Sequence, residues 1–209
     1  MLSPRFFCPC ATTRTRTEAN ALKTQGKMEK NNKTIFVFDL DNTLVKTDQA
    51  NNLAYQEAIK QTTGKTIEPN SKRITRKDLN TYFPNLNNEQ LNEIIQLKEN
   101  LYCQYICHTI LNAELYKILN LLYKTGKETI LLTESRKNRA EQTCCHHKIS
   151  ALFCQKYYRE DYDDMVKYEY LNSLYNLPHN IILFENEQTE IQLAKQYKIQ
   201  ENQILTIKF

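Results

Sequence analysis

Two carboxylate side chains, Asp39 and Asp41, stand two positions apart directly after the apolar run Thr34 to Phe38. If that run is a strand, both carboxylates follow its carboxyl end and precede a polar turn, so both can face a ligand crevice and share one cation. The plainer alternative is a turn-forming Asp-Asn pair at a strand end, which is common by itself. The choice between the two depends on the elements that surround the pair.

Buried strands alternate with helices over much of the remaining chain. Short apolar runs rich in β-branched and aromatic residues predict strands at 34–38, 129–132, 180–184 and 203–207. Helical patterns occupy 136–148, 163–176 and 187–198. Strands that are apolar throughout are typical of parallel sheets. The sequence therefore predicts an α/β fold with a doubly wound, mainly parallel, Rossmann-like sheet, whose ligands bind beyond the carboxyl ends of the strands.

A long segment after the first strand lacks any convincing strand pattern. Potential N-cap residues predict where its helices begin: Thr47 or Asp48, Thr75 and Asn87. A last helix runs through Leu115 and Leu122 to Gly126, which suits the residue after a helix end. We therefore expect an inserted helical lid, or cap. The predicted boundaries are 47–126 for the cap, and 28–46 with 127–209 for the α/β core.

The composition excludes several classes of protein. Hydrophobic residues make up 41% of the 209 positions and the formal net charge is only +4, which rules out a fully disordered chain. No stretch approaches the roughly 18 apolar residues of a membrane helix, so we expect that the protein does not span a membrane. Five basic residues and one acidic residue lie in 1–27, so the chain from Met28 onward is neutral. That part lacks the basic patch that a nucleic-acid partner requires.

Residues 1–27 differ in composition from the remainder. Pro4 and Arg5 interrupt the apolar stretch that a secretory signal would need. We expect a disordered leader or upstream extension here, with Met28 as the natural start; an organellar transit peptide is the alternative. Without a secretory signal, the seven Cys residues are expected to be reduced thiols, which favours a cytoplasmic protein.

The sequence IFVFDLDNTL, which contains Asp39 and Asp41, resembles the first motif of the haloacid dehalogenase superfamily of phosphohydrolases, DxDxT after a hydrophobic strand. The resemblance implies that Asp39 attacks phosphorus and forms an aspartyl-phosphate. It implies that Asp41 protonates the leaving oxygen and then activates water. A carboxylate nucleophile of this kind divides one difficult hydrolysis into two easier steps. Thr43 would support the loop and contact the substrate side of the site.

The same resemblance assigns two further catalytic residues. Thr133, after the second predicted strand, would donate a hydrogen bond to a phosphoryl oxygen. The alternative role for Thr133 is to cap the following helix, but Ser135 is better placed for that role. Lys167 lies where the family has a lysine that offsets the charge of the nucleophile and of the phosphoryl group. Lys156 is the second candidate for this role. The alternative interpretation of Lys167 is an ordinary solvated lysine on the surface.

The fourth motif departs from the family pattern. After the third predicted strand the family usually has a pair of acidic residues, whereas this chain has Glu185 followed by Asn186. Mg²⁺ prefers oxygen ligands and keeps several waters, so Glu185 and Asn186 can still bind it. By resemblance, the expected ligands are Asp39, Asp41, Glu185 and Asn186. Two other acidic residues, Glu187 and Glu190, would contribute through water.

The cap is expected to set substrate specificity. Arg73 and Arg76 are candidates to bind a distal anion of the substrate, with Lys77 beside them; solvated charges at a helix start are the alternative. The segment between Thr133 and Lys167 is too short to contain a second cap. The presence of Asp41 argues against a true dehalogenase, since these lack the second Asp and the metal.

The sequence therefore predicts a Mg²⁺-dependent phosphatase that acts on a small phosphorylated metabolite, as a monomer or homodimer. A sugar-phosphate mutase of the same family is one alternative, because the fate of the aspartyl-phosphate depends on water exclusion by the cap. A catalytically weak relative retained for binding or regulation is another, and the departure at Glu185 and Asn186 is its support.

Overall fold

The computed structural model describes residues 34–67, 73–162, 165–175 and 180–209. The predicted leader, 1–27, lies outside the described residues. Among the helices that the structure describes, none is both long enough and apolar enough to cross a membrane.

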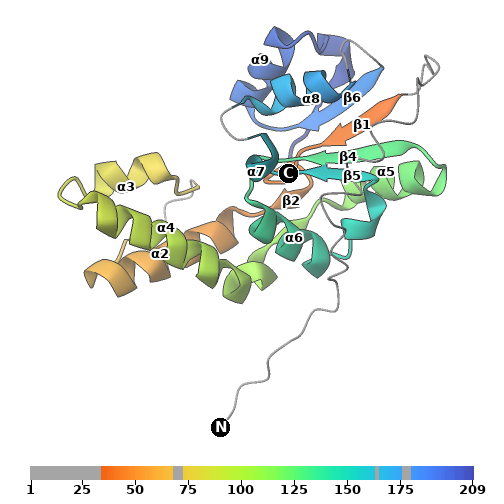
Figure 1. Ribbon diagram of the computed structural model, residues 1–209. Helices are drawn as coiled ribbons and strands as arrows, with labels where there is room; N and C mark the ends of the chain where they lie inside the picture. The colour runs from red at the N-terminus through yellow and green to blue at the C-terminus, as the bar shows by residue number, and fades with distance from the viewer. Residues whose placement is uncertain (1–33, 68–72, 163–164, 176–179) are drawn as a thin grey trace, which may run out of the picture. The chain divides into compact units, whose positions relative to one another are not determined.

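Five parallel strands form the central sheet in the order β5-β4-β1-β6-β7 (Figure 1). Their bounds are Ile35–Phe38 for β1, Glu128–Leu132 for β4, Gln155–Tyr157 for β5, Ile181–Glu185 for β6 and Ile204–Thr206 for β7. All four predicted strands are present, and β5 is an addition at one edge. In the register, Phe38 is level with Leu131 and Phe184. The next residue, Asp39, therefore lies beside the carboxyl ends of β4 and β6.

Helices cover both faces of this sheet. One face carries α5 (Ala113–Lys124), α6 (Lys137–His146) and η2 (Ser150–Leu152), and the other carries α7 (Arg159–Tyr162), α8 (Lys167–Tyr175) and α9 (Gln188–Gln196). The short helix η3 (Glu201–Gln203) directly precedes β7. Along β1, Phe38 packs with the first group, while Val37 packs with the second, because successive side chains of a strand point to opposite faces. The predicted doubly wound, Rossmann-like α/β fold is confirmed.

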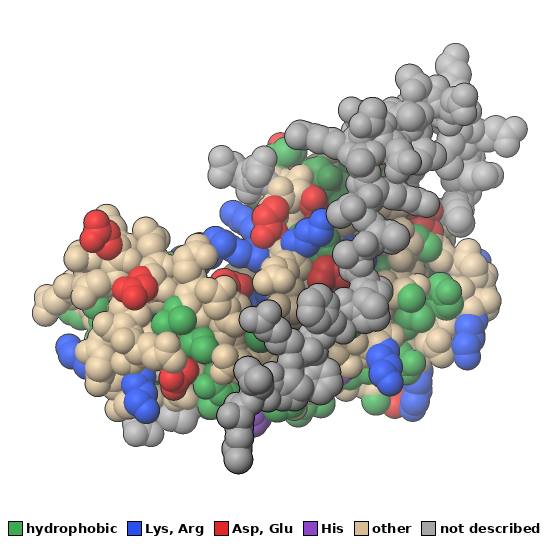
Figure 2. Space-filling view, turned by 60° about the horizontal axis from the view of Figure 1, so that its bottom comes forward, with side chains coloured by type: hydrophobic (Ala, Val, Ile, Leu, Met, Phe, Trp, Pro, Cys, Tyr) green, Lys and Arg blue, Asp and Glu red, His purple; other side chains and the backbone are tan. Residues whose placement is uncertain are grey.

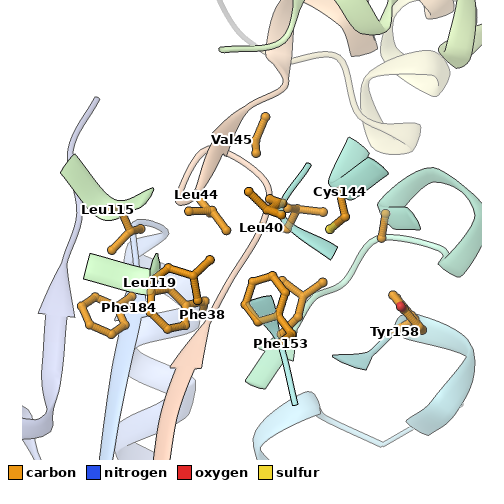
Figure 3. Packing of buried hydrophobic residues seen from close by; sticks show 13 residues of the cluster. Phe38, Leu40, Leu44, Val45, Leu115, Leu119, Cys144, Phe153, Tyr158 and Phe184 are labelled. Atoms are coloured by element: carbon orange, nitrogen blue, oxygen red, sulfur yellow. The ribbon is translucent and has the colours of Figure 1, made fainter. Parts of the chain in front are cut away.

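The cluster on the first face is built around aromatic rings from neighbouring strands. The rings of Phe38 and Phe184 stack with centroids 4.3 Å apart, and Phe153 meets Phe38 edge-on at 6.0 Å. Leu40, in the loop after β1, packs into the same cluster near Cys144 (Figure 3). Because Leu40 points into the core, the residues on either side of it, Asp39 and Asp41, are left to face the opposite way.

The chain leaves the core through β2 (Val45–Lys46) and returns through β3 (Ile110–Leu111), which pair as a short antiparallel ribbon. Between them lie α2 (Asp48–Thr63), α3 (Arg76–Tyr82), α4 (Asn88–Leu101) and η1 (Tyr102–His108). These helices begin at the predicted N-caps, Thr47, Thr75 and Asn87. They have a hydrophobic cluster of their own, which includes Ala54, Ile59, Leu79, Ile94 and Tyr102.

The helix α5 differs from its expected assignment to the cap. Leu115 and Leu119 pack in the same cluster as Phe38 and Phe184, and the helix contacts β4. It ends at Lys124, with Gly126 in the left-handed conformation (φ +66°), as predicted for the residue after a helix end. We therefore propose that the cap ends before β3 rather than at residue 126.

Candidate active site

A cavity of about 220 Å³ opens where β1, β4 and β6 end. Its lining residues are Asp39, Asp41, Asn42, Arg73, Thr133, Glu134, Arg139, Lys167, Glu185, Asn186, Glu187 and Glu190. The structure thus brings all four residues that were predicted to be catalytic to one place, together with both residues of the fourth motif. Carboxyl ends of neighbouring parallel strands are where ligands of such folds bind.

The loop after β1 turns tightly so that it can present both carboxylates. The backbone N–H groups of Leu44 and Val45 donate to the carbonyl of Leu40, and Asn42 donates to the carbonyl of Val45. Asn42 has φ +59°, a left-handed conformation that Asn adopts more readily than most residues. The Asp-Asn pair is therefore part of a turn as well as part of the cavity.

A buried lysine joins the first carboxylate to the fourth motif. Lys167 Nζ lies 3.4 Å from Asp39 Oδ1, 2.9 Å from Glu185 Oε2 and 3.2 Å from Glu190 Oε2. Lys167 and Glu185 are each 1% exposed. Lys167 is the first residue of α8, and this helix packs on the sheet face toward which Asp39 points.

The charges around Asp39 and Lys167 shift the pKa values of both residues. Burial raises the pKa of Asp39 well above its ordinary value, the negative charge of Glu185 adds to the rise, and Lys167 opposes it. Burial alone would lower the pKa of Lys167, but Asp39, Tyr168 and Glu185 hold it well above its ordinary value. Lys167 is therefore a permanent cation next to a carboxylate that is crowded by negative charge.

Glu185 uses both oxygens for contacts within the chain. Its Oε2 accepts from Lys167 Nζ and from the hydroxyl of Tyr168 at 3.0 Å. Its Oε1 accepts from the backbone N–H groups of Asn186 and Glu187 at 3.0 and 3.1 Å. These four bonds fix the end of β6 and the position of Lys167.

Asp41 lies between two arginines from different parts of the fold. Arg73, from the cap, and Arg139, from α6, each approach one carboxylate oxygen to 3.3 Å. The hydroxyls of Thr47 and Ser135 donate to the same two oxygens. Burial would raise the pKa of Asp41, but the two arginines and the two hydroxyls together hold it well below its ordinary value. Asp41 is therefore an ionised carboxylate.

Two threonines complete the cavity. The Thr133 hydroxyl oxygen accepts from the backbone N–H of Ser135 at 3.1 Å, and the hydroxyl can donate its hydrogen to a bound oxygen. The Thr43 hydroxyl donates to Asn186 Oδ1 at 2.8 Å. Thr43 is fully buried beneath the loop, so it positions Asn186 and does not line the cavity.

Neither Arg139 nor Ser135 was assigned to the site from the sequence. Ser135 was expected to cap the following helix, but α6 has Arg136 at its N-cap without a side-chain cap bond, and the Ser135 hydroxyl binds Asp41 instead. Arg139 follows Ser135 by four residues, one helical turn, and donates to its hydroxyl. That spacing after the second motif is the only signal that could have pointed to Arg139.

The other lysine and arginine candidates lie elsewhere. Lys156 pairs with Glu141 at 2.6 Å, away from the cavity. Arg76 lines a second, neighbouring cavity, whereas Lys77 is exposed and lines neither.

The oxygen atoms near Asp39 suit a hard divalent cation. The crowding of Asp39 by Glu185 is a negative excess that an added positive charge would offset. Within the described ranges, no three His, Cys, Asp or Glu side chains are grouped as a metal centre requires. The carboxylates of Asp39 and Asp41 and the amide oxygen of Asn186 line the cavity, and oxygen ligands of this kind fit Mg²⁺.

Comparison with known proteins identifies the family to which these features belong. The family model described as haloacid dehalogenase-like hydrolase matches residues 36–202, which is most of the chain. This match confirms the family predicted from the sequence, and with it the expectation of an enzyme. No curated protein matches the chain.

Solved structures share the fold at low sequence identity. A haloacid dehalogenase-like hydrolase from Streptococcus pneumoniae has a TM-score of 0.64 at 19% identity and covers 85% of both chains. A predicted phosphoglycolate phosphatase from Haemophilus somnus has a TM-score of 0.68 at 15% identity and covers 86% of both chains. CbbY from Rhodobacter sphaeroides, solved with phosphate, has a TM-score of 0.68 at 12% identity, covering 85% of this chain and 86% of its own.

Proposed function

The chain belongs to the haloacid dehalogenase-like hydrolase family, and we propose that its cavity removes phosphate from a small phosphomonoester through an aspartyl-phosphate. The observation that carries this proposal is the contact of buried Lys167 with Asp39, in a cavity that Asp41 and Thr133 also line. The phosphatase and phosphate-complex names among the structural neighbours support the same reaction class. A cytoplasmic location and a monomeric or homodimeric state remain predictions from the sequence.

Asp39 is the proposed nucleophile. One of its carboxylate oxygens forms a bond to phosphorus while the bond from phosphorus to the leaving oxygen breaks, and Asp41 supplies the proton that the leaving alcohol requires. In the second step water attacks phosphorus, Asp41 takes a proton from that water, and Asp39 is released. Lys167 and Thr133 donate to phosphoryl oxygens and so stabilise the charge that the transfer concentrates there.

Without a bound substrate, the ionised form of Asp41 favours the second step. Arg73 and Arg139 keep Asp41 ionised, which is the form that accepts a proton from water. To act as an acid in the first step, Asp41 must gain a proton. We propose that an arriving phosphate draws one of these arginines toward its own oxygens and thereby weakens their hold on Asp41.

We assign the cation site to Asp39, Asp41 and Asn186, with Glu185 as the residue that fixes Asn186 and Lys167. Mg²⁺ at this place would neutralise charge on the transferring phosphoryl group and relieve the crowding of Asp39. Because Asn186 is neutral where an acid is usual, we expect Mg²⁺ to be bound more weakly than by a carboxylate set.

Phosphate release from an aryl phosphate and from a panel of small phosphomonoesters, including sugar phosphates, tests the proposal. We expect turnover by the wild-type protein in Mg²⁺, loss of turnover in chelator, and a fall of about 10³-fold or more in Asp39→Asn. Asp161→Asn is the matched control, because Asp161 is exposed and lies outside the cavity. Asp39→Asn activity within tenfold of the wild type would contradict the assignment. A folded wild type that is inert over the whole panel would favour a binding module instead.

A further inference from the structure

We infer that the natural substrate carries a second anionic group, a phosphate or a carboxylate, which binds in a second cavity beside the active site. This inference rests on the proposed phosphohydrolase function and names the class of its substrate. It depends on the composition of that cavity, on two arginines that have no acidic partner among the described residues, and on one buried lysine.

The second cavity has a volume of about 520 Å³ and lies between the cap and the core. Six of its lining side chains are basic: Arg73, Arg76, Lys98, Arg136, Arg139 and Arg159. Two are acidic: Glu99 and Glu134. Figure 2 shows basic side chains gathered beside acidic ones near the middle of the described surface. Basic side chains therefore outnumber acidic ones in this cavity, and such an excess of positive charge attracts an anion.

Among the described residues, two of these cations have no acidic partner. Arg73 and Arg139 pair with Asp41, and Arg159 pairs with Glu134 at 2.5 Å. By contrast, no carboxylate of the described residues lies within ion-pairing distance of Arg76 or Arg136. Arg76 comes from the start of α3 and Arg136 from the start of α6, so the two approach the cavity from the cap and from the core. Their guanidinium groups can bind an anionic oxygen group in the forked manner typical of arginine.

A buried lysine supports the same conclusion. Lys98 of α4 is only 2% exposed, and its ammonium lies over the rings of Tyr55 and Tyr102 at 5.2 and 5.7 Å. Its ion-pair partner is Glu99, at 3.1 Å. A charged lysine is costly to bury, and the neighbouring Arg139 increases that cost. An anion in the cavity would stabilise the charge of Lys98.

The two cavities are neighbours, because Arg73, Glu134 and Arg139 line both. A substrate with its phosphate against Asp39 and Lys167 can therefore extend past the two arginines into the second cavity. Phosphate alone or an aryl phosphate would leave this cavity without an anion. A small molecule with anionic groups at both ends fills both.

Binding measured by calorimetry tests this inference without requiring turnover. The probes are two pairs that differ mainly in the second anion: 3-phosphoglycerate with glycerol 3-phosphate, and fructose 1,6-bisphosphate with fructose 6-phosphate. We expect the doubly anionic member of at least one pair to bind about tenfold more tightly or better. The first pair tests a carboxylate as the second anion, and the second pair tests a phosphate. Wild-type protein in chelator and Asp39→Asn in Mg²⁺ are measured in parallel, so that neither preparation hydrolyses the probe.

Variants of the two arginines test whether they bind the second anion. In Arg76→Gln and in Arg136→Gln we expect the advantage of the second anion to fall to about threefold or less. Lys77→Gln is the matched control, since Lys77 is the next residue on α3 and lines neither cavity; its preference should equal that of the wild type. Equal binding of both members in both pairs, or a preference unchanged in both arginine variants, overturns the inference.

The outcomes separate the inference from the proposed function. Turnover with no preference for a second anion would leave the phosphatase proposal intact and overturn the distal site. A preference that depends on Arg76 and Arg136, in a protein that releases no phosphate, would establish the distal site and contradict the phosphatase.

Discussion

Glu185 shows how one residue can serve a site without touching the reacting atoms. Its carboxylate accepts four hydrogen bonds, two from Lys167 and Tyr168 and two from the backbone after β6. Glu185 and Glu190 share the charge of Lys167 with Asp39, and Glu185 is the more deeply buried of the two. We therefore regard Glu185 as the positioning residue for Lys167.

Glu185→Gln tests this role. The amide replaces one acceptor oxygen with a donor, which must then face either Lys167 or the two backbone N–H groups. We expect a loss of about 1–3 kcal/mol in the free energy of unfolding and a fall of about tenfold or more in kcat on an aryl phosphate. Urea denaturation and steady-state kinetics measure both. Glu169→Gln, at an exposed position of α8, is the control. A Glu185→Gln protein as stable and as active as this control would show that Glu185 has no positioning role.

At the residue scale, the resemblance to the family's motifs pointed to the acidic residues and to Lys167, because each motif lies at the end of a recognisable strand or at the start of a helix. It could not point to Arg139, since pairing with Asp41 depends on how α6 lies across the end of β1. Nor could it assign Ser135, whose hydroxyl could cap a helix or bind a carboxylate with equal ease. Three-dimensional packing makes those choices.

Among the elements, the helix starts of the cap were the most predictable, whereas the helix expected at 163–176 begins at Lys167. Asn87 and Gln90 form a reciprocal capping box at α4, with Asn87 Oδ1 accepting from Gln90 N at 2.8 Å. The strands β1, β4 and β6 were predictable because they are buried on both faces. By contrast, β5 has the sequence Gln155–Tyr157, whose polar, half-exposed side chains give no such signal. The two-residue strands β2 and β3 are too short for any periodicity.

The capping box gives a test at the element scale. We expect Asn87→Ala to lower the stability of the protein by about 1 kcal/mol, because a backbone donor at the start of α4 loses its acceptor. This corresponds to a Tm lower by about 2–4 °C for a chain of this size, measured by calorimetry. Asn88→Ala changes the same side chain one position later, at an exposed site inside the helix, and should leave Tm nearly unchanged. Equal shifts in the two variants would contradict the role of the cap.

The assignment of α5 also belongs to this scale. Sequence placed it in the cap because no strand precedes it clearly, whereas its apolar face, with Leu115 and Leu119, packs against the sheet. Helical periodicity shows that a helix has an apolar face but does not show which neighbour covers it.

In the molecule as a whole, the cap and the core meet through charged groups as well as through the packing of η1 against α6. Arg73 of the cap pairs with Asp41 of the core and with Asp48 of α2, and Lys98 lies buried on the cap side. A cap that is connected by two strands and shares the Arg73–Asp41 ion pair with the core can respond to an anionic ligand, because such a ligand competes for the same arginine.

The buried lysine gives this part of the molecule a pH dependence. Burial, with Arg139 adding to it, lowers the pKa of Lys98 to about 7, while an unfolded chain has a lysine pKa of about 10.4. Between these values the unfolded state binds more protons, so stability rises with pH. We expect the wild type to become more stable relative to Lys98→Met as the pH increases from 7 to 10, by at most about 1.4 kcal/mol per pH unit. Urea denaturation across this range measures the difference. A difference that stays constant or falls would contradict a depressed pKa.

The most direct test of the whole account is to find the phosphoryl group on the protein. Wild-type protein is mixed with an aryl phosphate and Mg²⁺, quenched in acid before steady state, digested, and analysed by mass spectrometry. The account predicts one added phosphoryl group on the peptide that contains Asp39, and none in Asp39→Asn. Turnover with no phosphoryl group on that peptide, or with the group on a different residue, would contradict it.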